Sequence, residues 1–179
     1  MSQAYIRITP VYGDTELKLE GFTDSSFQSD VDDYRSNSGY IFKLFGGAVC
    51  WKSSKQTTTA DSVTEAEYIA ACDAAKEAVW IRKFIQELGV VPCADDPVQV
   101  YCDNTGAVAQ AKESRSHPKS KHVLRKFHLV REIVERGEVV VERVTGEDNV
   151  ADPCTKLLSI SVHEKHRVSM GLRYMNSWL

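Results

Sequence analysis

The first regular element is predicted from the stretch Leu17-Lys-Leu-Glu-Gly-Phe-Thr-Asp24, which begins with strict alternation of apolar and polar residues. An acidic loop over residues 25–37 follows it. Two further β-rich runs, Gly39–Phe45 and Ala48–Ser53, flank the dipeptide Gly46-Gly47, which suits a tight hairpin turn. The sequence therefore predicts three strands that form an antiparallel meander.

Helices and strands alternate in the remainder of the chain. Thr64–Leu88 is rich in Ala, Glu, Lys, Ile and Leu and contains no Gly or Pro, so we expect a long helix that ends at Gly89. The later predicted elements are a strand at Pro97–Asp103, a short helix at Asn104–Ala111, a helix at about 119–136, a strand at Glu138–Val144 and a helix from Asp148 or Asn149 to Lys156. This order favours an α/β fold, in which helices cover a five-stranded mixed sheet made of an antiparallel meander followed by parallel strands.

Length and composition indicate one soluble folded domain. The chain has 179 residues and a mass of 20.1 kDa, with 42% hydrophobic and 26% charged residues. We expect an N-terminal extension at 1–16, the folded domain at 17–157 and a moderately helical C-terminal tail at 158–179. Trp51 and Trp80 are expected in the core.

The lack of secretory or membrane signals and the pattern of the cysteines both favour a reducing compartment. No apolar run approaches the eighteen or so residues of a membrane-spanning helix, and residues 1–14 lack the features of a signal peptide. The five cysteines are odd in number, widely spaced and without metal-ligand spacing. We therefore expect neither membrane association nor a disulfide framework.

Charge is distributed unevenly along the chain, although the formal net charge is only −3 and the pI about 6.0. Residues 14–33 contain seven Asp or Glu against Lys18 alone. Residues 112–131 contain seven Lys or Arg against Glu113 alone, with three histidines interleaved. An acidic region and a basic region in one small domain suggest a metal site beside a phosphate-binding surface.

Four carboxylates are placed where such a sheet would bring them together: Asp24 and Asp103 at strand ends, Glu67 in the first turns of the long helix, and Asp152 at the start of the last helix. Clustered carboxylates without a balancing Lys or Arg favour a bound cation, and Mg²⁺ prefers oxygen ligands. Two such ions would catalyse an in-line displacement at a phosphodiester.

Each of these residues also has a purely structural interpretation. Asp24 and Asp103 could be turn or cap residues. Asp152 could be a first-turn negative charge that the helix dipole favours. Glu67 could form a capping box with Thr64, although Ser62 and Glu65 form an equally good one. Periodicity alone leaves these alternatives open.

Several ordered motifs resemble the RNase H domain of copia-type long-terminal-repeat retrotransposon Pol polyproteins of plants, over about Leu17–Leu158. They include Gly21-Phe-Thr-Asp-Ser-Ser-Phe27, Ser38-Gly-Tyr-Ile-Phe42, Val49-Cys-Trp-Lys-Ser-Ser-Lys-Gln56, Thr64-Glu-Ala-Glu-Tyr-Ile-Ala-Ala71, Tyr101-Cys-Asp-Asn104 and Glu147-Asp-Asn-Val-Ala-Asp-Pro-Cys-Thr-Lys156.

The resemblance implies an RNase H fold at 17–157 and hydrolysis of the RNA strand of RNA–DNA hybrids with two Mg²⁺ ions, for which Mn²⁺ could substitute. The family's catalytic metal ligands fall on Asp24, Glu67, Asp103 and Asp152. The implied partners are the hybrid and the reverse transcriptase domain of the same polyprotein. The implied location is the cytoplasm, within a virus-like particle, with the nucleus as a further option.

The basic segment is expected to contact nucleic acid, chiefly phosphates of the DNA strand, which position a duplex without reading its sequence. Selection of the RNA strand requires contacts with 2′-hydroxyl groups. The predicted nucleic-acid-binding residues are Ser25, Ser26, Asn104, Thr105, Lys119, Lys121, His122, Arg125, Lys126, His128 and Arg131.

The chain departs from the family pattern in one loop and in its context. Many RNases H have a His shortly before the last catalytic Asp, whereas residues 145–151 contain none, so Glu147 or Asp148 is a candidate for that role. The chain also begins shortly before the RNase H region, as an excised or stand-alone domain would. The alternative function is an adaptor that binds protein or nucleic acid with little or no catalysis. A transposase or integrase is disfavoured because the carboxylate spacing differs.

Overall fold

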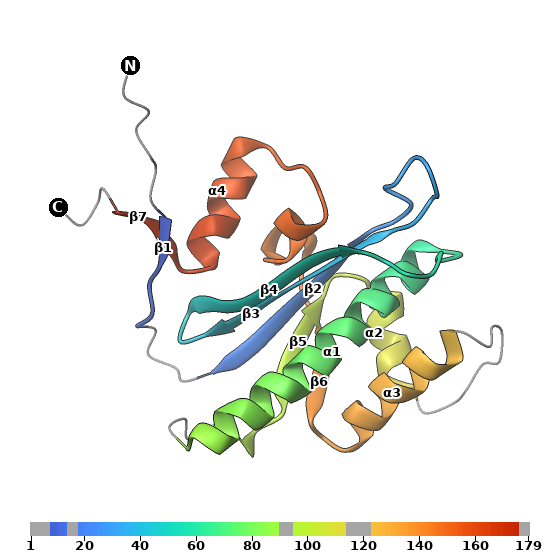
Figure 1. Ribbon diagram of the computed structural model, residues 1–179, viewed down its shortest axis with the longest axis horizontal. Coiled ribbons are helices and arrows are strands. Elements are labelled where there is room, and N and C mark those ends of the chain that lie inside the picture. The colour runs from blue at the N-terminus through green and yellow to red at the C-terminus, as the bar shows by residue number, and fades with distance from the viewer. Residues whose placement is uncertain (1–7, 14–17, 90–94, 114–122, 176–179) are drawn as a thin grey trace.

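The computed structural model describes residues 8–13, 18–89, 95–113 and 123–175, and for residues 123–127 the backbone alone. A five-stranded sheet forms its centre (Figure 1). The strands of this sheet are β2 (Leu19–Ser26), β3 (Asn37–Leu44), β4 (Gly47–Lys55), β5 (Val98–Cys102) and β6 (Val139–Arg143).

The strand order in this sheet is β4-β3-β2-β5-β6. Strands β2, β3 and β4 pair antiparallel, as hairpin connections require, whereas β5 pairs parallel with both β2 and β6. The predicted α/β fold with a meander followed by parallel strands is confirmed.

The helices begin and end at the signals visible in the sequence. At the start of α1, Ser62 accepts a hydrogen bond from the Glu65 backbone N–H, and at its end Gly89 adopts the left-handed conformation. Asn104 caps α2 in the same way by accepting from the Ala107 N–H. The α-helices are α1 (Val63–Leu88), α2 (Thr105–Lys112), α3 (Val123–Glu135) and α4 (Ile160–Ser169), and the described 3₁₀-helices are η2 (Gly146–Asp148) and η3 (Asp152–Cys154).

Helices cover both faces of the sheet (Figure 1). Helices α1, α2 and α3 pack on one face over the main core, in which alanines of α1 meet apolar side chains of β5 and β6. On the other face, η3 and α4 lie over a smaller cluster that includes Phe22, Ile41 and Met170. The sheet edge between these two layers is where β2 and β5 end.

The prediction of a helix from Asp148 or Asn149 to Lys156 is wrong. This segment forms the two short 3₁₀-helices η2 and η3 instead. The Asn149 side chain is fully buried, and it donates to the Thr23 carbonyl oxygen and accepts from the Ala151 N–H. Since this side chain ties the segment to β2 and Pro153 lacks a backbone N–H, a continuous α-helix does not form.

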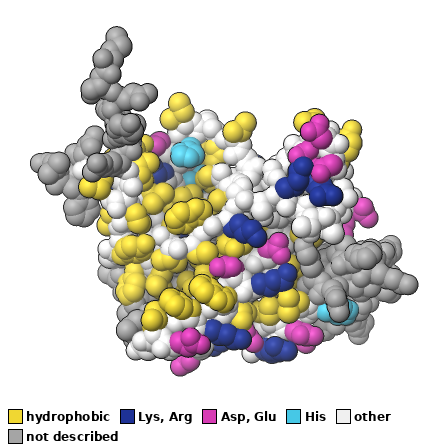
Figure 2. All heavy atoms as spheres, in the orientation of Figure 1, with side chains coloured by type: hydrophobic (Ala, Val, Ile, Leu, Met, Phe, Trp, Pro, Cys, Tyr) yellow, Lys and Arg dark blue, Asp and Glu magenta, His cyan; other side chains and the backbone are white. Residues whose placement is uncertain are grey.

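Trp51 and Trp80 are not in the core, contrary to the prediction. The side chains are 67% and 61% exposed. Trp51 lies on β4, an edge strand of the sheet, and Trp80 lies on the solvent-exposed side of α1, stacked on Phe84. Figure 2 shows hydrophobic side chains exposed among charged ones on the face that carries α1.

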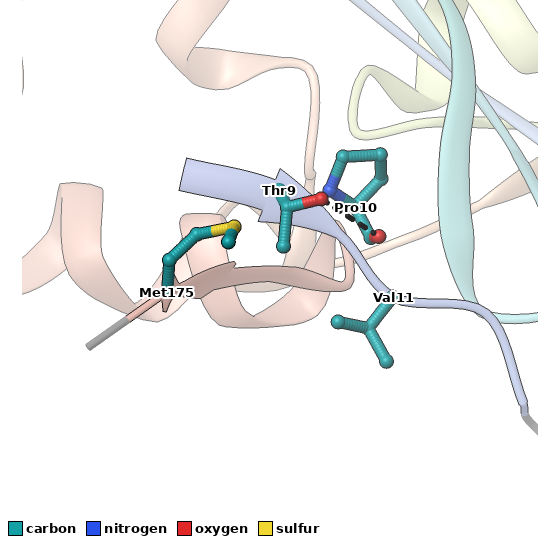
Figure 3. Close-up of a pocket in the computed structure, with 4 residues that line it drawn as sticks. All are labelled: Thr9, Pro10, Val11 and Met175. Atoms are coloured by element: carbon teal, nitrogen blue, oxygen red, sulfur yellow. Dashed lines mark hydrogen bonds between the residues drawn. The ribbon is translucent and has the colours of Figure 1, made fainter. Parts of the chain in front are cut away.

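A second small sheet joins the two ends of the described chain. Strand β1 (Ile8–Pro10) pairs antiparallel with β7 (Leu172–Tyr174) (Figure 1). Figure 3 shows the apolar pocket beside them, about 340 Å³ and lined by Thr9, Pro10, Val11 and Met175. The division into an extension, a domain and a tail stays a prediction. Within the described ranges, none of the helices is long and apolar enough to cross a membrane.

Candidate metal centre

Two of the predicted carboxylates lie at the carboxyl ends of neighbouring parallel strands. Asp24 is near the end of β2, fully buried and opposite Gly39 of β3. Asp103 directly follows β5 and is partly exposed. Because β2 and β5 run parallel, both side chains reach the same edge of the sheet.

Glu67 approaches the same edge from α1. It is 4% exposed, and its Oε1 accepts a 3.2 Å hydrogen bond from the Ser25 backbone N–H. Glu65, two residues earlier, is half-buried and accepts from the Asp61 N–H. Because Ser62 and Glu65 cap the start of α1, the Glu67 side chain is not needed for capping and turns into the interior.

Asp152 reaches the cluster from η3, which packs against β3. Carboxylate oxygens of Asp24, Asp103 and Asp152 lie within 4.8 Å of one another. A second group, formed by donor atoms of Glu67, Cys102 and Asp103, meets the same criterion. The structure thus brings together all four predicted carboxylates, and this acidic cluster could bind metal because its oxygen donors fit a hard divalent cation. Their catalytic roles stay a prediction.

Lys156 is a site residue that the sequence analysis missed. Its Nζ lies 2.9 Å from Asp24 Oδ1 and 2.9 Å from Asp152 Oδ1, and the Thr155 hydroxyl donates to Asp24 Oδ2. The expectation of carboxylates without a balancing Lys or Arg is therefore wrong for this part of the cluster. The i, i+4 spacing of Asp152 and Lys156 was a usable signal, because the helix predicted through Lys156 already places these two side chains on one face.

Burial raises the pKa of two of these carboxyl groups and so favours their protonated form. Burial is the main cause that raises the pKa of Asp24 to about 6, against the hydrogen bonds from Thr155 and Lys156. Burial and then the charges of Asp24 and Asp103 raise the pKa of Glu67 to about 8. The site without a cation therefore retains a proton near neutral pH.

The comparisons with known proteins agree with this geometry. No protein-family model matches the chain. It is 35% identical over 161 residues to the retrovirus-related Pol polyprotein of transposon TNT 1-94 from Nicotiana tabacum, which covers 90% of the chain and 12% of the polyprotein. An RNase H1 isolated from compost superposes with a TM-score of 0.56 at 21% identity, over 78% of this chain and 94% of that one. The chain is an RNase H-fold domain of the retrotransposon Pol type. The resemblance stated from its motifs is confirmed.

The RNase H-fold domain is also similar to part of a larger viral protein. A foamy viral protease-reverse transcriptase matches with a TM-score of 0.55 at 15% identity, over 78% of this chain and 20% of that one. The present chain spans about an eighth of its Nicotiana tabacum relative.

The predicted nucleic-acid-binding residues of the RNase H-fold domain are only partly described. Ser25 is buried, Ser26 and Asn104 are half-buried, and Thr105 is exposed beside the carboxylates. On α3, His128 is exposed and Arg131 is half-buried. Arg125 and Lys126 belong to the part of α3 for which the backbone alone is described. Lys119, Lys121 and His122 lie outside the described residues. The nucleic-acid contacts stay predictions.

Asp148 and Glu147, the candidate substitutes for the loop His, do not contact the carboxylate cluster. Asp148 accepts from the Thr145 hydroxyl and pairs with Lys165 of α4 at 3.1 Å, and Glu147 is exposed. The structure gives neither residue a contact with the four carboxylates.

Gly39 permits the close packing that places Asp152 in the RNase H-fold domain. A Cβ atom at this position would lie 2.5 Å from Cys154 Cβ and 2.9 Å from Thr155 Cγ2. We expect Gly39→Ala to displace η3 and to lower divalent-ion affinity about 10–100-fold, as the loss of supporting contacts does at metal sites. Calorimetric titration with Mg²⁺ or Mn²⁺ measures this.

Gly21→Ala is the matched control for this prediction. Its Cβ would lie at the same distance of 2.5 Å from Phe42, in the same sheet but away from η3. Both variants should lose about 1–3 kcal/mol of unfolding free energy. Equal ion affinity in the two variants would show that Gly39 has no special link to the site.

Lys156 is expected to compete with a cation for Asp24 and Asp152. We predict that Lys156→Gln lowers the Mg²⁺ concentration for half-saturation about three- to tenfold, or up to about 1.4 kcal/mol. Lys165→Gln is the control, because Lys165 pairs with Asp148 rather than with a site carboxylate. Weaker Mg²⁺ binding by Lys156→Gln, in the same calorimetric titration, is the opposite result and would give Lys156 a supporting role.

Proposed function

We propose that this domain is a ribonuclease H that hydrolyses the RNA strand of RNA–DNA hybrids with Mg²⁺, as a part of retrotransposon reverse transcription. The observation that carries the proposal is the convergence of Asp24, Asp103 and Asp152 oxygens within 4.8 Å at one edge of an RNase H fold. Lys156 offsets part of the charge on Asp24 and Asp152, but three carboxylates held this close still carry a net negative charge that a divalent cation or protons would offset.

The relatives support the same reaction and setting. An RNase H1 with a TM-score of 0.54 and the foamy viral protease-reverse transcriptase were each solved in complex with an RNA/DNA hybrid. The Nicotiana tabacum relative is a Pol polyprotein. We therefore include a reverse transcriptase domain of the same polyprotein among the proposed partners, and the cytoplasm, within a virus-like particle, as the proposed location, with the nucleus as a further option.

Asp24, Glu67, Asp103 and Asp152 are the proposed metal ligands. When bound there, two Mg²⁺ ions supply activation of a water and stabilisation of the leaving oxygen of a phosphodiester. Asp24 accepts from the Thr155 hydroxyl, and Glu67 accepts from the Ser25 backbone N–H, so both side chains are oriented before substrate binds. The expected products carry 5′-phosphate and 3′-hydroxyl ends.

The hybrid is proposed to lie over the carboxylate edge and α3. Thr105 is exposed directly after Asp103 and Asn104, where it can meet the RNA strand. His128 and Arg131 of α3, together with the basic residues that precede them in sequence, would meet phosphates of the DNA strand. This arrangement supports recognition of the duplex by its shape rather than by its sequence.

Substrate choice tests this proposal. We expect cleavage of the labelled RNA strand in an RNA–DNA hybrid with Mg²⁺, and none of the DNA strand, of double-stranded DNA or of double-stranded RNA. Equal cleavage of the RNA strand in double-stranded RNA would contradict the proposed specificity. Tight binding of the hybrid without cleavage would favour the adaptor function.

A further inference from the structure

A thiol lies within the carboxylate cluster. Donor atoms of Glu67, Cys102 and Asp103 all lie within 4.8 Å of one another, and two of these residues belong to the proposed magnesium site. We infer that Glu67, Cys102 and Asp103 form a distinct site for a thiophilic divalent ion, Zn²⁺ in biological terms, that overlaps the magnesium centre. Binding at this site stands on its own donors, and only its inhibitory consequence rests on the proposed function.

The spacing of the donors suits a tetrahedral ion. Cys102 Sγ lies 3.9 Å from Glu67 Oε2. A tetrahedral Zn²⁺ with bonds of about 2.3 Å to sulfur and about 2.1 Å to oxygen requires a sulfur–oxygen separation of about 3.6 Å. A shift of a few tenths of an ångström, within the freedom of the Glu67 side chain, therefore closes the site.

The position of the thiol follows from the strand. Along β5, Val98, Val100 and Cys102 are buried on the face toward α1, so Cys102 meets Glu67 across this layer. Asp103 is the next residue and is partly exposed, which gives an ion a route from solvent. The other two donors are almost fully buried, at 0% for Cys102 and 4% for Glu67.

A buried hydroxyl that makes no hydrogen bond of normal geometry lies beside Glu67. Among the described residues, Ser25 Oγ makes no hydrogen bond of normal geometry, although Ser25 is only 4% exposed. The Ser25 backbone N–H donates to Glu67, and its hydroxyl lies near enough to that carboxyl to help lower its pKa. Because a buried hydroxyl without a well-formed hydrogen bond is costly, Ser25 Oγ is available as a further oxygen partner for an ion bound by Glu67 or for a water on that ion.

The donor set selects the ion. Mg²⁺ takes oxygen ligands, whereas thiolate with carboxylate suits Zn²⁺. On binding, the Cys102 Sγ–H bond breaks, the sulfur electron pair forms the bond to the ion, and the proton passes to solvent. No oxidant or reductant is involved.

Occupation of this site would stop the proposed reaction. Asp103 contributes to both groups of donors, so its carboxylate would be drawn toward Cys102 and away from Asp24 and Asp152. Zn²⁺ is therefore expected to act as an inhibitor that binds in competition with Mg²⁺.

Cadmium is the probe, because a cadmium–thiolate bond has an ultraviolet charge-transfer absorption that reports sulfur ligation without any enzyme assay. We expect Cd²⁺ titrated into the full chain to produce this band, and Cys102→Ser to remove one thiolate's contribution to it. Cys154→Ser is the matched control, since Cys154 is absent from the donor group. Asp103→Asn should weaken the affinity for Cd²⁺ at least about tenfold while retaining the Cys102-dependent band at saturation.

The inference is overturned if the wild type shows no such band, or if the band in folded Cys102→Ser equals that of the wild type. Cys102→Ala replaces the serine variant if thermal melting shows that the latter is unfolded. Because the readout is absorption, a chain that binds Cd²⁺ through Cys102 but cuts no RNA would support this site while contradicting the proposed function.

Discussion

Asp103→Asn is expected to lower RNA cleavage by more than about 10²-fold and to leave hybrid binding nearly unchanged. Even the loss of a supporting contact costs about 10–100-fold at a metal site, and Asp103 contributes to both donor groups. The amide keeps the size of the carboxylate but removes the charge that a cation needs. Single-turnover cleavage and a separate hybrid-binding titration in Ca²⁺ or EDTA measure the two quantities.

Asp96→Asn is the control for this substitution, since Asp96 is an exposed carboxylate before β5 that is absent from both donor groups. It should cleave as the wild type does. Retained cleavage in Asp103→Asn would refute the role of Asp103. Loss of cleavage together with loss of folding would instead require Asp24→Asn, for which the same separation of cleavage from binding is expected.

The second large effect concerns stability without a divalent ion. The pKa of Asp24 is raised from 3.8 to about 6 and that of Glu67 from 4.5 to about 8. Between these values the folded protein holds protons that the unfolded chain releases, so the free energy of unfolding falls as pH rises from about 4 to about 8. Thermal melting in EDTA should show this decline, and Mg²⁺ should reverse it at pH 8.

Glu67→Gln should therefore stabilise the metal-free protein at pH 8 while abolishing cleavage. The gain is on the order of a few kcal/mol, at about 1.4 kcal/mol for each unit of pKa shift. For a domain of this size this corresponds to roughly 5–10 °C in melting temperature. At pH 5, where Glu67 is protonated in the folded state, the difference should nearly disappear.

Glu65→Gln is the matched control on the same helix. Glu65 is half-buried and accepts from the Asp61 N–H at the start of α1, so its replacement should cost up to about 1 kcal/mol at both pH values. Its effect on cleavage should be mild. A reversal of the two variants, in stability or in cleavage, would show that Glu65 rather than Glu67 belongs to the site.

The order of helices and strands along the chain, and with it the mixed sheet, was predictable because local signals mark each element. Alternation before Asp24, the Gly46-Gly47 turn and the end of α1 at Gly89 each mark an element boundary. A parallel pairing of β2 with β5 then places Asp24 and Asp103 together without any knowledge of side-chain contacts. The capping of α1 by Ser62 similarly separates Glu67 from Glu65.

The remaining features depend on contacts between residues far apart in sequence. Asn149 is drawn inward by the Thr23 carbonyl oxygen, which converts a predicted helix into 3₁₀ turns and brings Lys156 onto Asp24. Strands β1 and β7 have three residues each, too few for a periodic pattern, and pair across almost the whole chain. The meeting of Cys102 with Glu67 likewise requires the packing of α1 on β5.

The most direct test is cleavage of a hybrid labelled at one end of its RNA strand, by the full chain with Mg²⁺, with Mn²⁺ and with EDTA. The account predicts loss of the full-length RNA strand with either ion, none with EDTA, and products with 3′-hydroxyl ends. A folded chain that binds the hybrid with a strong salt dependence but leaves the RNA intact with both ions would contradict it.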